Sequence, residues 1–198
     1  MALSVKNVME NGRISLSNMR SRYVERIFEN SPTIEWDLFF LNVAKEVAKN
    51  SKCLSRKIGA VLVRDKSIIS TGYNGGPRGV PGCWTRNPNY ERVCPRQLQG
   101  FKSGEGLHLC VAGHAERNAI VQAARFGIAT KGTTLVCYCG IPCAPCLIEI
   151  INAGVIEVVY KKNSSTNNLG DDYYDELSKW IVENSNLLVR GVEVDEKI

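Results

Sequence analysis

The chain has 198 residues, of which 44% are hydrophobic and 23% charged, and its formal net charge is +5. This composition is typical of an ordinary globular domain with a substantial core. No apolar run is long enough to span a bilayer, and the N-terminal MALSVKNVMENGRISLSNMR lacks the apolar core of a secretory signal, so we expect a cytoplasmic protein without a membrane partner.

The chain begins with a polar, weakly patterned segment, residues 1–32, which ends at Ser31-Pro32. We expect this segment to be an N-terminal extension and residues 33–198 to form one domain. From residue 33 to about residue 50, apolar residues recur at helical spacing and predict a helix with one buried face. The apolar positions of that face are Trp36, Phe39, Phe40, Val43, Ala44, Val47 and Ala48.

Two runs rich in β-branched residues follow, KIGAVLV at residues 57–63 and SIISTGY at residues 67–73. The polar residues Arg64, Asp65 and Lys66 separate them, so the two runs predict strands joined by a tight turn. Residues 74–110 then break the regular pattern with frequent glycine and proline. Since an irregular connection of this length is unusual inside a compact domain, we expect something to hold this insertion in place.

The insertion carries much of the excess positive charge. Five basic residues lie between Asn74 and Cys110, against two acidic ones. Such a balance attracts phosphate, although a solvated loop is an equally good interpretation for any single arginine. The basic residues are Arg78, Arg86, Arg92, Arg96 and Lys102.

Regular structure resumes with alternating helices and strands. Helices are predicted at residues 115–126 and 143–153, and strands at residues 133–138, 155–160 and 187–194. The last strand follows an amphipathic helix that contains Tyr174, Leu177, Trp180 and Ile181. The alternation predicts a mainly parallel sheet in this half, with both faces covered.

Two helix beginnings in this half carry metal-binding residue types. His114 and Glu116 open one helix, and Cys143 and Cys146, three residues apart on one helical face, open the next. Parallel strands place such N-termini at the same edge of a sheet, so we expect the two pairs to meet. In a reducing compartment, the eight cysteines favour ligand, catalytic or buried roles over a disulfide framework.

Two thiolates and one imidazole are ligands that zinc prefers, and three protein ligands leave a fourth position for water. Zinc lowers the pKa of bound water to about 7, and the helix N-termini favour the thiolate form of both cysteines. Glu116 is then suited to carry protons between the water and a substrate. A closed zinc site with a cysteine as fourth ligand is the alternative, but it leaves Glu116 without a role.

The order H-x-E then P-C-x-x-C, here HAE at residues 114–116 and PCAPC at residues 142–146, is the signature of the zinc nucleobase deaminases. Over residues 36–160 the chain resembles the deoxycytidylate (dCMP) deaminases of the cytidine deaminase superfamily. The resemblance rests on CLSRKIGAVLV, STGYNGGPRGVPGC, SGEGLHLCVAGHAERNAI and PCAPCLIEIINAGVIEVVY. GYNG with HAExNA is more similar to this branch than to the tRNA adenosine or riboflavin-pathway deaminases.

The resemblance implies a three-layer α/β/α fold around a mixed five-stranded sheet. It implies hydrolysis of dCMP to dUMP and ammonia by a zinc-bound hydroxide, which feeds thymidylate synthesis. Glu116 would protonate N3 of cytosine and later the amine, and the backbone at Ala115 would hold the base edge. Asn74 matches the asparagine that bonds the sugar hydroxyl, with a simple turn residue as the alternative. The candidates for phosphate contacts are Arg56, Lys57 and Arg78.

Some family members have a second, structural zinc site, which the resemblance places in the insertion and its flanks. Its ligands would be Cys53, Cys83, Cys94 and Cys110, with His108 or water as a substitute for one of them. Free buried thiols are the alternative. Regulated members are hexamers that dCTP activates and dTTP inhibits, and Arg125 matches an arginine of their subunit contacts and regulation. A solvated cation at a helix end is its alternative.

The chain departs from the family at Cys137 and Cys139, where a threonine-containing strand end is common. Either the wall that faces the substrate differs from that of the family, or both cysteines are small buried hydrophobic residues on a strand, which is the interpretation we favour. Other substrates remain open: dCTP, or adenosine or cytosine in a polynucleotide such as tRNA. Trp84 and Tyr90 among the insertion's arginines suit a polynucleotide, which we do not expect. A non-catalytic zinc-stabilised binding module is the last alternative, and Glu116 argues against it.

Overall fold

The computed structural model describes residues 33–102, 105–162 and 176–194. The predicted N-terminal extension, residues 1–32, and Tyr174 of the last predicted helix lie outside the described residues. From Glu35 onward, the described residues belong to one compact unit, Glu35–Ile198. Within the described ranges, no helix combines the length and the hydrophobicity that a membrane span requires.

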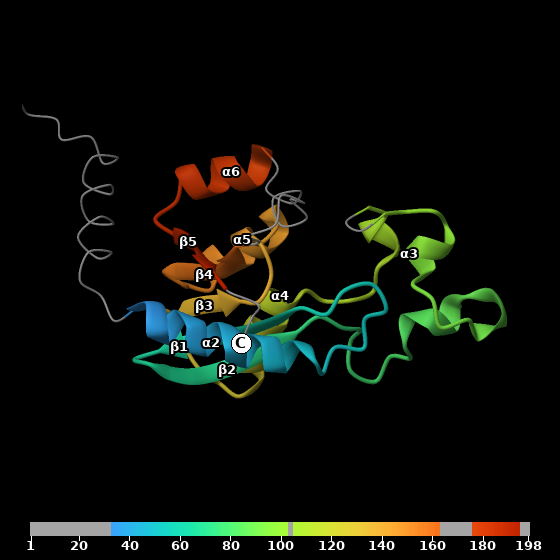
Figure 1. Cartoon of the computed structure of the whole chain (residues 1–198), viewed down its shortest axis with the longest axis horizontal. Helices are drawn as coiled ribbons and strands as arrows, with labels where there is room; N and C mark the ends of the chain where they lie inside the picture. Colours follow the sequence, from blue (N-terminus) through green and yellow to red (C-terminus); the bar gives the residue numbers. More distant parts are fainter. Residues whose placement is uncertain (1–32, 103–104, 163–175, 195–198) are drawn as a thin grey trace, which may run out of the picture. The chain divides into compact units, whose positions relative to one another are not determined.

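The five strands among the described residues form one sheet in the order β2-β1-β3-β4-β5 (Figure 1). Their bounds are β1 Gly59–Arg64, β2 Ser67–Tyr73, β3 Thr134–Cys137, β4 Glu157–Lys162 and β5 Leu188–Glu193. β1 pairs antiparallel with both β2 and β3, whereas β3, β4 and β5 pair in parallel. The predicted mixed five-stranded sheet, parallel in its second half, is therefore confirmed.

The predicted hairpin joins β1 to β2 through the two residues Asp65 and Lys66. Both have positive φ, 50° and 58°. Positive φ at both central residues is the signature of the type I′ turn, whose twist matches that of the flanking strands. The tight turn therefore fixes how β2 lies against the central strand β1.

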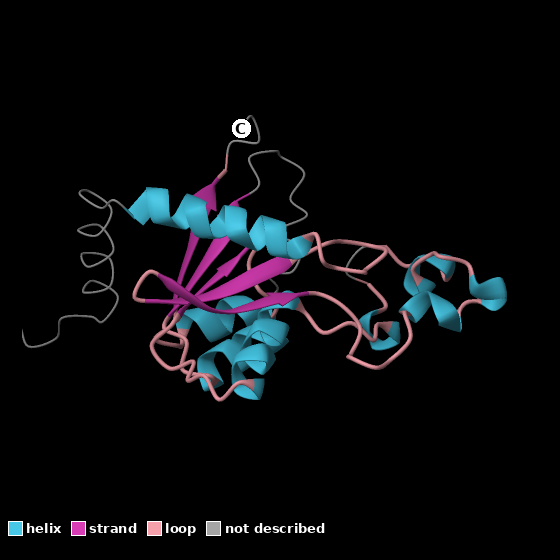
Figure 2. Ribbon diagram, turned by 90° about the horizontal axis from the view of Figure 1, so that it is seen from below, coloured by secondary structure: helices cyan, strands magenta, loops and turns pink. Residues whose placement is uncertain are grey.

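Helices cover both faces of the sheet, which confirms the three-layer α/β/α arrangement (Figure 2). Their bounds are α2 Thr33–Ala48, α4 Ala115–Arg125, α5 Ala144–Asn152 and α6 Glu176–Glu183. On β3, Val136 packs in the cluster that contains Phe40 of α2, whereas Leu135 packs in the cluster that contains Ala119 and Leu147. The two-residue period of a strand thus separates the layer of α2 from the layer of α4 and α5.

The predicted buried face of α2 is wrong for two of its residues. Trp36 and Phe39 are 38% and 51% exposed, whereas Leu41, which lay outside the predicted face, is buried. The helix contacts the sheet along a narrower stripe, which passes through Phe40, Leu41 and Ala44. Trp36 and Phe39 pack edge to face against each other, with ring centroids 5.8 Å apart. The spacing of apolar residues alone therefore predicted a wider contact between α2 and the sheet than the structure has.

Two glycines let helices approach the sheet closely. A Cβ atom at Gly59 would lie 2.0 Å from the carbonyl oxygen of Ala44 in α2, and one at Gly72 would lie 2.2 Å from that of Ala115 in α4. Real Cβ atoms do not come this close to backbone atoms, so neither position accepts a side chain without a shift of the helix. Gly72 thus places the first turn of α4 directly on β2.

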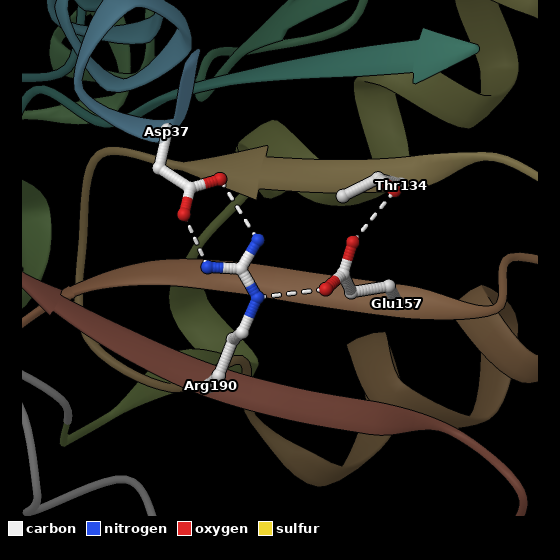
Figure 3. A network of polar contacts seen from close by, with 4 residues as sticks. All are labelled: Asp37, Thr134, Glu157 and Arg190. Atoms are coloured by element: carbon white, nitrogen blue, oxygen red, sulfur yellow. Dashed lines mark hydrogen bonds and ion pairs between the residues drawn. The ribbon is translucent and has the colours of Figure 1, made fainter. Parts of the chain in front are cut away.

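A buried polar network ties α2 to the edge strand β5 of the sheet (Figure 3). Arg190 of β5 donates to both carboxylate oxygens of Asp37 in α2, and its Nε donates to Glu157 Oε1 of β4 over 2.7 Å. The hydroxyl of Thr134 in β3 donates to Glu157 Oε2 over 2.8 Å. Burial lowers the pKa of Arg190, but its bonds to the two carboxylates outweigh burial and raise it, so the guanidinium stays charged.

Candidate metal centre and substrate pocket

The two motif-bearing helices begin at the same edge of the sheet. β2 and β3 both run antiparallel to β1, so their carboxyl ends lie at one edge, and α5 follows β3 there. The chain enters α4 after an isolated bridge in which Gly75, just beyond β2, exchanges two backbone hydrogen bonds with Gly113. His114 and Cys143 are the N-cap residues of α4 and α5.

The structure brings His114, Cys143 and Cys146 together. Nδ1 of His114 lies 3.4 Å from the Cys143 sulfur and 3.3 Å from the Cys146 sulfur. All three donor atoms lie within 4.8 Å of one another. In a tetrahedral zinc site with ordinary bond lengths, a ligand nitrogen and sulfur are about 3.6 Å apart. The donor set and its spacing therefore fit zinc, with Nδ1 as the histidine ligand.

The charges at this site suit thiolate ligands. Hydrogen bonding from the Cys146 thiol lowers the pKa of Cys143 to about 4, although burial opposes this shift. The pKa of Cys146 is raised in turn because it supplies that proton. The bond to Cys143 raises the pKa of His114, although burial opposes it. One thiolate thus forms readily, and a bound cation would displace the second proton.

An ion pair joins the first turn of α4 to the second half of α5. Arg117 in the first turn of α4 donates through Nε to Glu149 of α5 over 2.8 Å, and its Nη2 lies 2.7 Å from the second carboxylate oxygen. The bidentate geometry fixes both distance and orientation between the helices. Because both side chains are more than a third exposed, we assign the pair to alignment rather than to stability.

Glu116 lies in the first turn of α4 and is only 4% exposed. Burial raises its pKa above the ordinary glutamate value, so its carboxyl group holds a proton more readily than an exposed one. A carboxyl group that both takes and gives protons needs such a shift toward neutral pH. The structure therefore sets a buried carboxyl group with a raised pKa beside the cysteine and histidine group.

The two unusual cysteines lie close to Glu116. Ligand atoms of Glu116, Cys137 and Cys139 all fall within 4.8 Å of one another. Cys137 is fully buried, as expected, whereas Cys139 is half-buried and lines the pocket in front of Glu116. Since β3 ends at Cys137, the chain bends and turns the Cys139 thiol toward the Gly140 carbonyl, 3.2 Å away. The interpretation as a buried hydrophobic residue therefore holds for Cys137 only.

A pocket opens in front of these groups. Its lining includes His114, Glu116 and Cys143 together with two residues predicted to contact the nucleotide, Asn74 and Arg56. The buried Asn74 side chain accepts from the Ile58 amide and donates to the Arg56 carbonyl, both over 2.9 Å. It thereby shapes the segment before β1, which also carries the pocket residue Ser55.

The side chains of the other predicted contact residues do not line this pocket. Ala115 is fully buried as the first residue of α4, and Lys57 is exposed outside the pocket lining. Arg78 donates to Gln122 of α4 over 2.7 Å. It lines a separate hollow with Arg125 and Asn118. The pocket instead receives Arg96 from the insertion, which the sequence marked only as part of a basic segment.

Side chains and short helices organise the insertion. The short elements are Cys83–Arg86, Pro88–Tyr90, α3 Pro95–Leu98 and Leu107–Leu109. Asn87 donates to the carbonyls of Glu91 and Val93 over 2.8 and 2.6 Å. Arg86 donates to the Leu109 carbonyl over 2.8 Å, which connects the beginning of the insertion to its end. The segment is therefore held by its own polar contacts as well as by the bridge at its base.

The four cysteines predicted for a second zinc site lie near one another, three from the insertion and Cys53 from the segment before β1. The pKa of Cys83 is raised first by burial and then by the thiols of Cys94, Cys53 and Cys110. Their sulfur atoms are less tightly grouped than the donor atoms around His114, since no three of them lie within 4.8 Å of one another. His108 is exposed and faces the ring of Phe101 edge on.

Comparison with known proteins agrees with this geometry. Residues 34–162 match the model of the cytidine and deoxycytidylate deaminase zinc-binding region. The deoxycytidylate deaminase of Schizosaccharomyces pombe is 40% identical over 126 residues, which are 63% of this chain but 36% of that protein. That of Mycobacterium phage D29 is 39% identical over 135 residues, 66% of this chain and 97% of that protein.

A solved structure has the same fold. The dCMP deaminase of cyanophage S-TIM5, crystallised with dCMP and dUMP, superposes with a TM-score of 0.56 at 25% identity, over 83% of this chain and 100% of that one. Since the family model covers more than half of the residues, these matches identify the chain as a member of the cytidine and deoxycytidylate deaminase family that carries its zinc-binding region.

Proposed function

We propose that residues 33–198 form a zinc-dependent deaminase domain that hydrolyses dCMP to dUMP and ammonia. The main support is the triangle of His114, Cys143 and Cys146 in one pocket with the buried Glu116. The choice of dCMP as the substrate is supported by the relatives named deoxycytidylate deaminase and by the phage enzyme crystallised with dCMP and dUMP. The proposal includes a cytoplasmic location, where dUMP would feed thymidylate synthesis.

Within this proposal, the three ligands hold zinc, which when bound acts as a Lewis acid and brings the pKa of a bound water to about 7. Glu116 takes a proton from the attacking water and delivers it to N3 as the new C4–O bond forms. It then moves the remaining proton of that water from the new C4 hydroxyl to the amine as the C4–N bond breaks. Water and dCMP are consumed, dUMP and ammonia leave, and Glu116 regains its starting state.

The pocket orients the nucleotide through three contacts in this proposal. The backbone at Ala115 holds the edge of the base. Asn74 still has one amide hydrogen and one oxygen lone pair to offer the sugar hydroxyl after its two bonds to the backbone. Arg56 lines the same pocket and brings a positive charge that suits the phosphate of the nucleotide. Because Asn74 both bonds the backbone before β1 and offers groups to the sugar, it couples the shape of the pocket to substrate binding.

An ammonia-release assay with dCMP, dCTP, deoxycytidine and CMP tests the proposed substrate. We expect the highest kcat/KM on dCMP. Deamination of single-stranded DNA or RNA, with dCMP untouched, would instead favour the polynucleotide alternative, for which exposed Tyr90 and the Arg92-stacked Trp84 are the candidate platforms. A protein that holds zinc but releases ammonia from none of these substrates would favour a non-catalytic binding module.

A second, structural zinc held by the insertion is also part of the proposal, with Cys53, Cys83, Cys94 and Cys110 as ligands. Burial first, and then the neighbouring thiols of Cys94, Cys53 and Cys110, raise the pKa of Cys83; as thiolates the four groups would repel, and a bound cation removes that repulsion. Metal analysis of the purified protein should find two zinc ions per chain, and one in Cys83→Ser. Cys139→Ser, a thiol outside this cluster, should keep both ions. A single zinc in the wild type would contradict the second site.

We also propose that the protein is a hexamer and that the effectors dCTP and dTTP bind in the hollow between the GYNG segment and α4. Arg78 and Arg125 both line it, and paired guanidinium groups suit the phosphates of an effector. We expect dCTP to raise and dTTP to lower the rate of the wild type, and Arg125→Gln to respond to neither. Sedimentation analysis should give the mass of six chains. Nucleotide responses that survive in Arg125→Gln would remove the effector role of this hollow.

A further inference from the structure

The insertion places an unusual arginine in the catalytic pocket. Arg96 of α3 is only 7% exposed. Its Nε is the only buried side-chain nitrogen or oxygen that lacks a hydrogen-bond partner among the described residues. A buried donor without a partner costs about 1 to 3 kcal/mol, and more when the group is charged. The position therefore calls for an explanation beyond folding.

The Arg96 side chain is held in place by the loop that follows it. Nη1 donates to the Glu105 carbonyl, and the Arg96 carbonyl accepts from the amide of Phe101 over 3.0 Å. Glu105 in turn accepts from the Lys102 amide over 2.9 Å. The guanidinium is thus oriented before any ligand arrives, which reduces the entropy lost on binding.

No carboxylate among the described residues forms an ion pair with Arg96. This contrasts with Arg190, whose side chain is only 15% exposed and pairs with two carboxylates. A buried positive charge needs an anion, and the anion that a nucleotide brings into this pocket is its phosphate. The pocket that Arg96 lines also holds Glu116 and Arg56, so one ligand can meet all three residues.

We propose that Arg96 binds the 5′-phosphate of the substrate and makes this domain select nucleoside monophosphates over nucleosides. The inference rests on the proposed function, and it assigns to the insertion a part in substrate recognition. Arg56 faces the pocket from the segment before β1 and Arg96 from α3. Two guanidinium groups from separate segments give a phosphate more donors than either gives alone.

A competing role for Arg96 is balance of the negative charge on the cysteine cluster. Cys94 is two residues away in sequence, and Cys53 and Cys110 line the same pocket. The two roles differ in their consequences, because charge balance affects zinc retention and all substrates equally. Phosphate binding affects only ligands that carry a phosphate.

The test compares Arg96→Gln with Arg92→Gln, an exposed arginine of the same insertion that stacks on Trp84. Kinetics are measured on dCMP and deoxycytidine, with zinc content recorded for each protein. Arg96→Gln should lose about 10- to 100-fold in kcat/KM on dCMP, mostly through a higher KM. This loss corresponds to the contribution of one hydrogen-bonded charged group to binding. Its kcat/KM on deoxycytidine should stay unchanged. Arg92→Gln should match the wild type on both substrates.

Two further measurements keep the inference testable if Arg96→Gln folds poorly or if the wild type is inactive. Arg96→Lys keeps a positive charge and should lose less on dCMP than Arg96→Gln. Binding of inorganic phosphate, followed by calorimetry without turnover, should weaken about tenfold or more in Arg96→Lys or Arg96→Gln. Equal losses on dCMP and deoxycytidine, loss of zinc, or unchanged phosphate affinity would overturn the inference. A wild type that binds phosphate but does not deaminate dCMP would refute the proposed function alone.

Discussion

Replacing Glu116 with glutamine should lower kcat on dCMP by about 10²- to 10⁴-fold, the usual contribution of a positioned acid or base. The amide has nearly the same shape as the carboxyl group but cannot take or release a proton. Burial raises the pKa of the native carboxyl, so the lost group is one that holds protons unusually well. Stopped assays of ammonia release, run at saturating dCMP, measure the effect.

Metal analysis and a matched variant separate this loss from structural damage. Glu116→Gln should keep the wild-type zinc content, because His114, Cys143 and Cys146 are unchanged. Glu183→Gln makes the same chemical change at an exposed residue of α6 and should keep full activity. If Glu116→Gln retained more than about a tenth of the activity, Glu116 would not be the proton carrier, and Cys139 in the same pocket would become the next candidate.

Replacing Arg190 with methionine should lower the free energy of unfolding by about 3 to 5 kcal/mol. The change leaves the carboxylates of Asp37 and Glu157 largely buried without their shared partner, at 9% and 20% side-chain exposure. Such a penalty comes mainly from the uncompensated charges and not from lost Coulomb attraction. Urea unfolding, with the slope m unchanged, measures the difference.

The control for Arg190→Met breaks an exposed ion pair. Lys49 pairs with Glu46 near the end of α2, with side chains 67% and 64% exposed, and Lys49→Met should change stability by less than about 1 kcal/mol. Arg190 packs on the face of the sheet that α2 covers, so the folded variant should keep its zinc. A loss below about 1 kcal/mol would mean that water or side-chain movement already compensates the two carboxylates.

The local elements and the metal triangle were within reach of sequence reasoning because both depend on short-range spacing. Runs rich in β-branched residues placed the first two strands to within about two residues, and the helix beginnings at His114 and Cys143 were predicted correctly. Parallel connections through helices then required the two N-termini to share one edge. The sequence alone could therefore group the two cysteines, the histidine and the glutamate, since each lies within four residues of one of these helix N-termini.

The packing of surfaces was decided only by the tertiary structure. Helical periodicity marks apolar residues but not the width of the contact, so Trp36 and Phe39 were assigned to a buried face that does not include them. The Arg190 network joins residues more than 150 positions apart, and nothing in the local pattern links Asp37 to β5. The spacing of polar residues within a helix or strand does not predict which distant residues they pair with.

The substrate end of the pocket depended on tertiary structure for the same reason. The insertion lacks regular structure, so spacing could not tell which of its arginines would face the pocket; Arg78 turns toward Gln122, whereas Arg96 lines the pocket. Local spacing along the chain determined the fold class, the helix beginnings and the grouping of His114, Cys143 and Cys146 with Glu116. Long-range packing of irregular backbone decided which charged side chains line the pocket, because an irregular loop takes its path from contacts with the rest of the molecule.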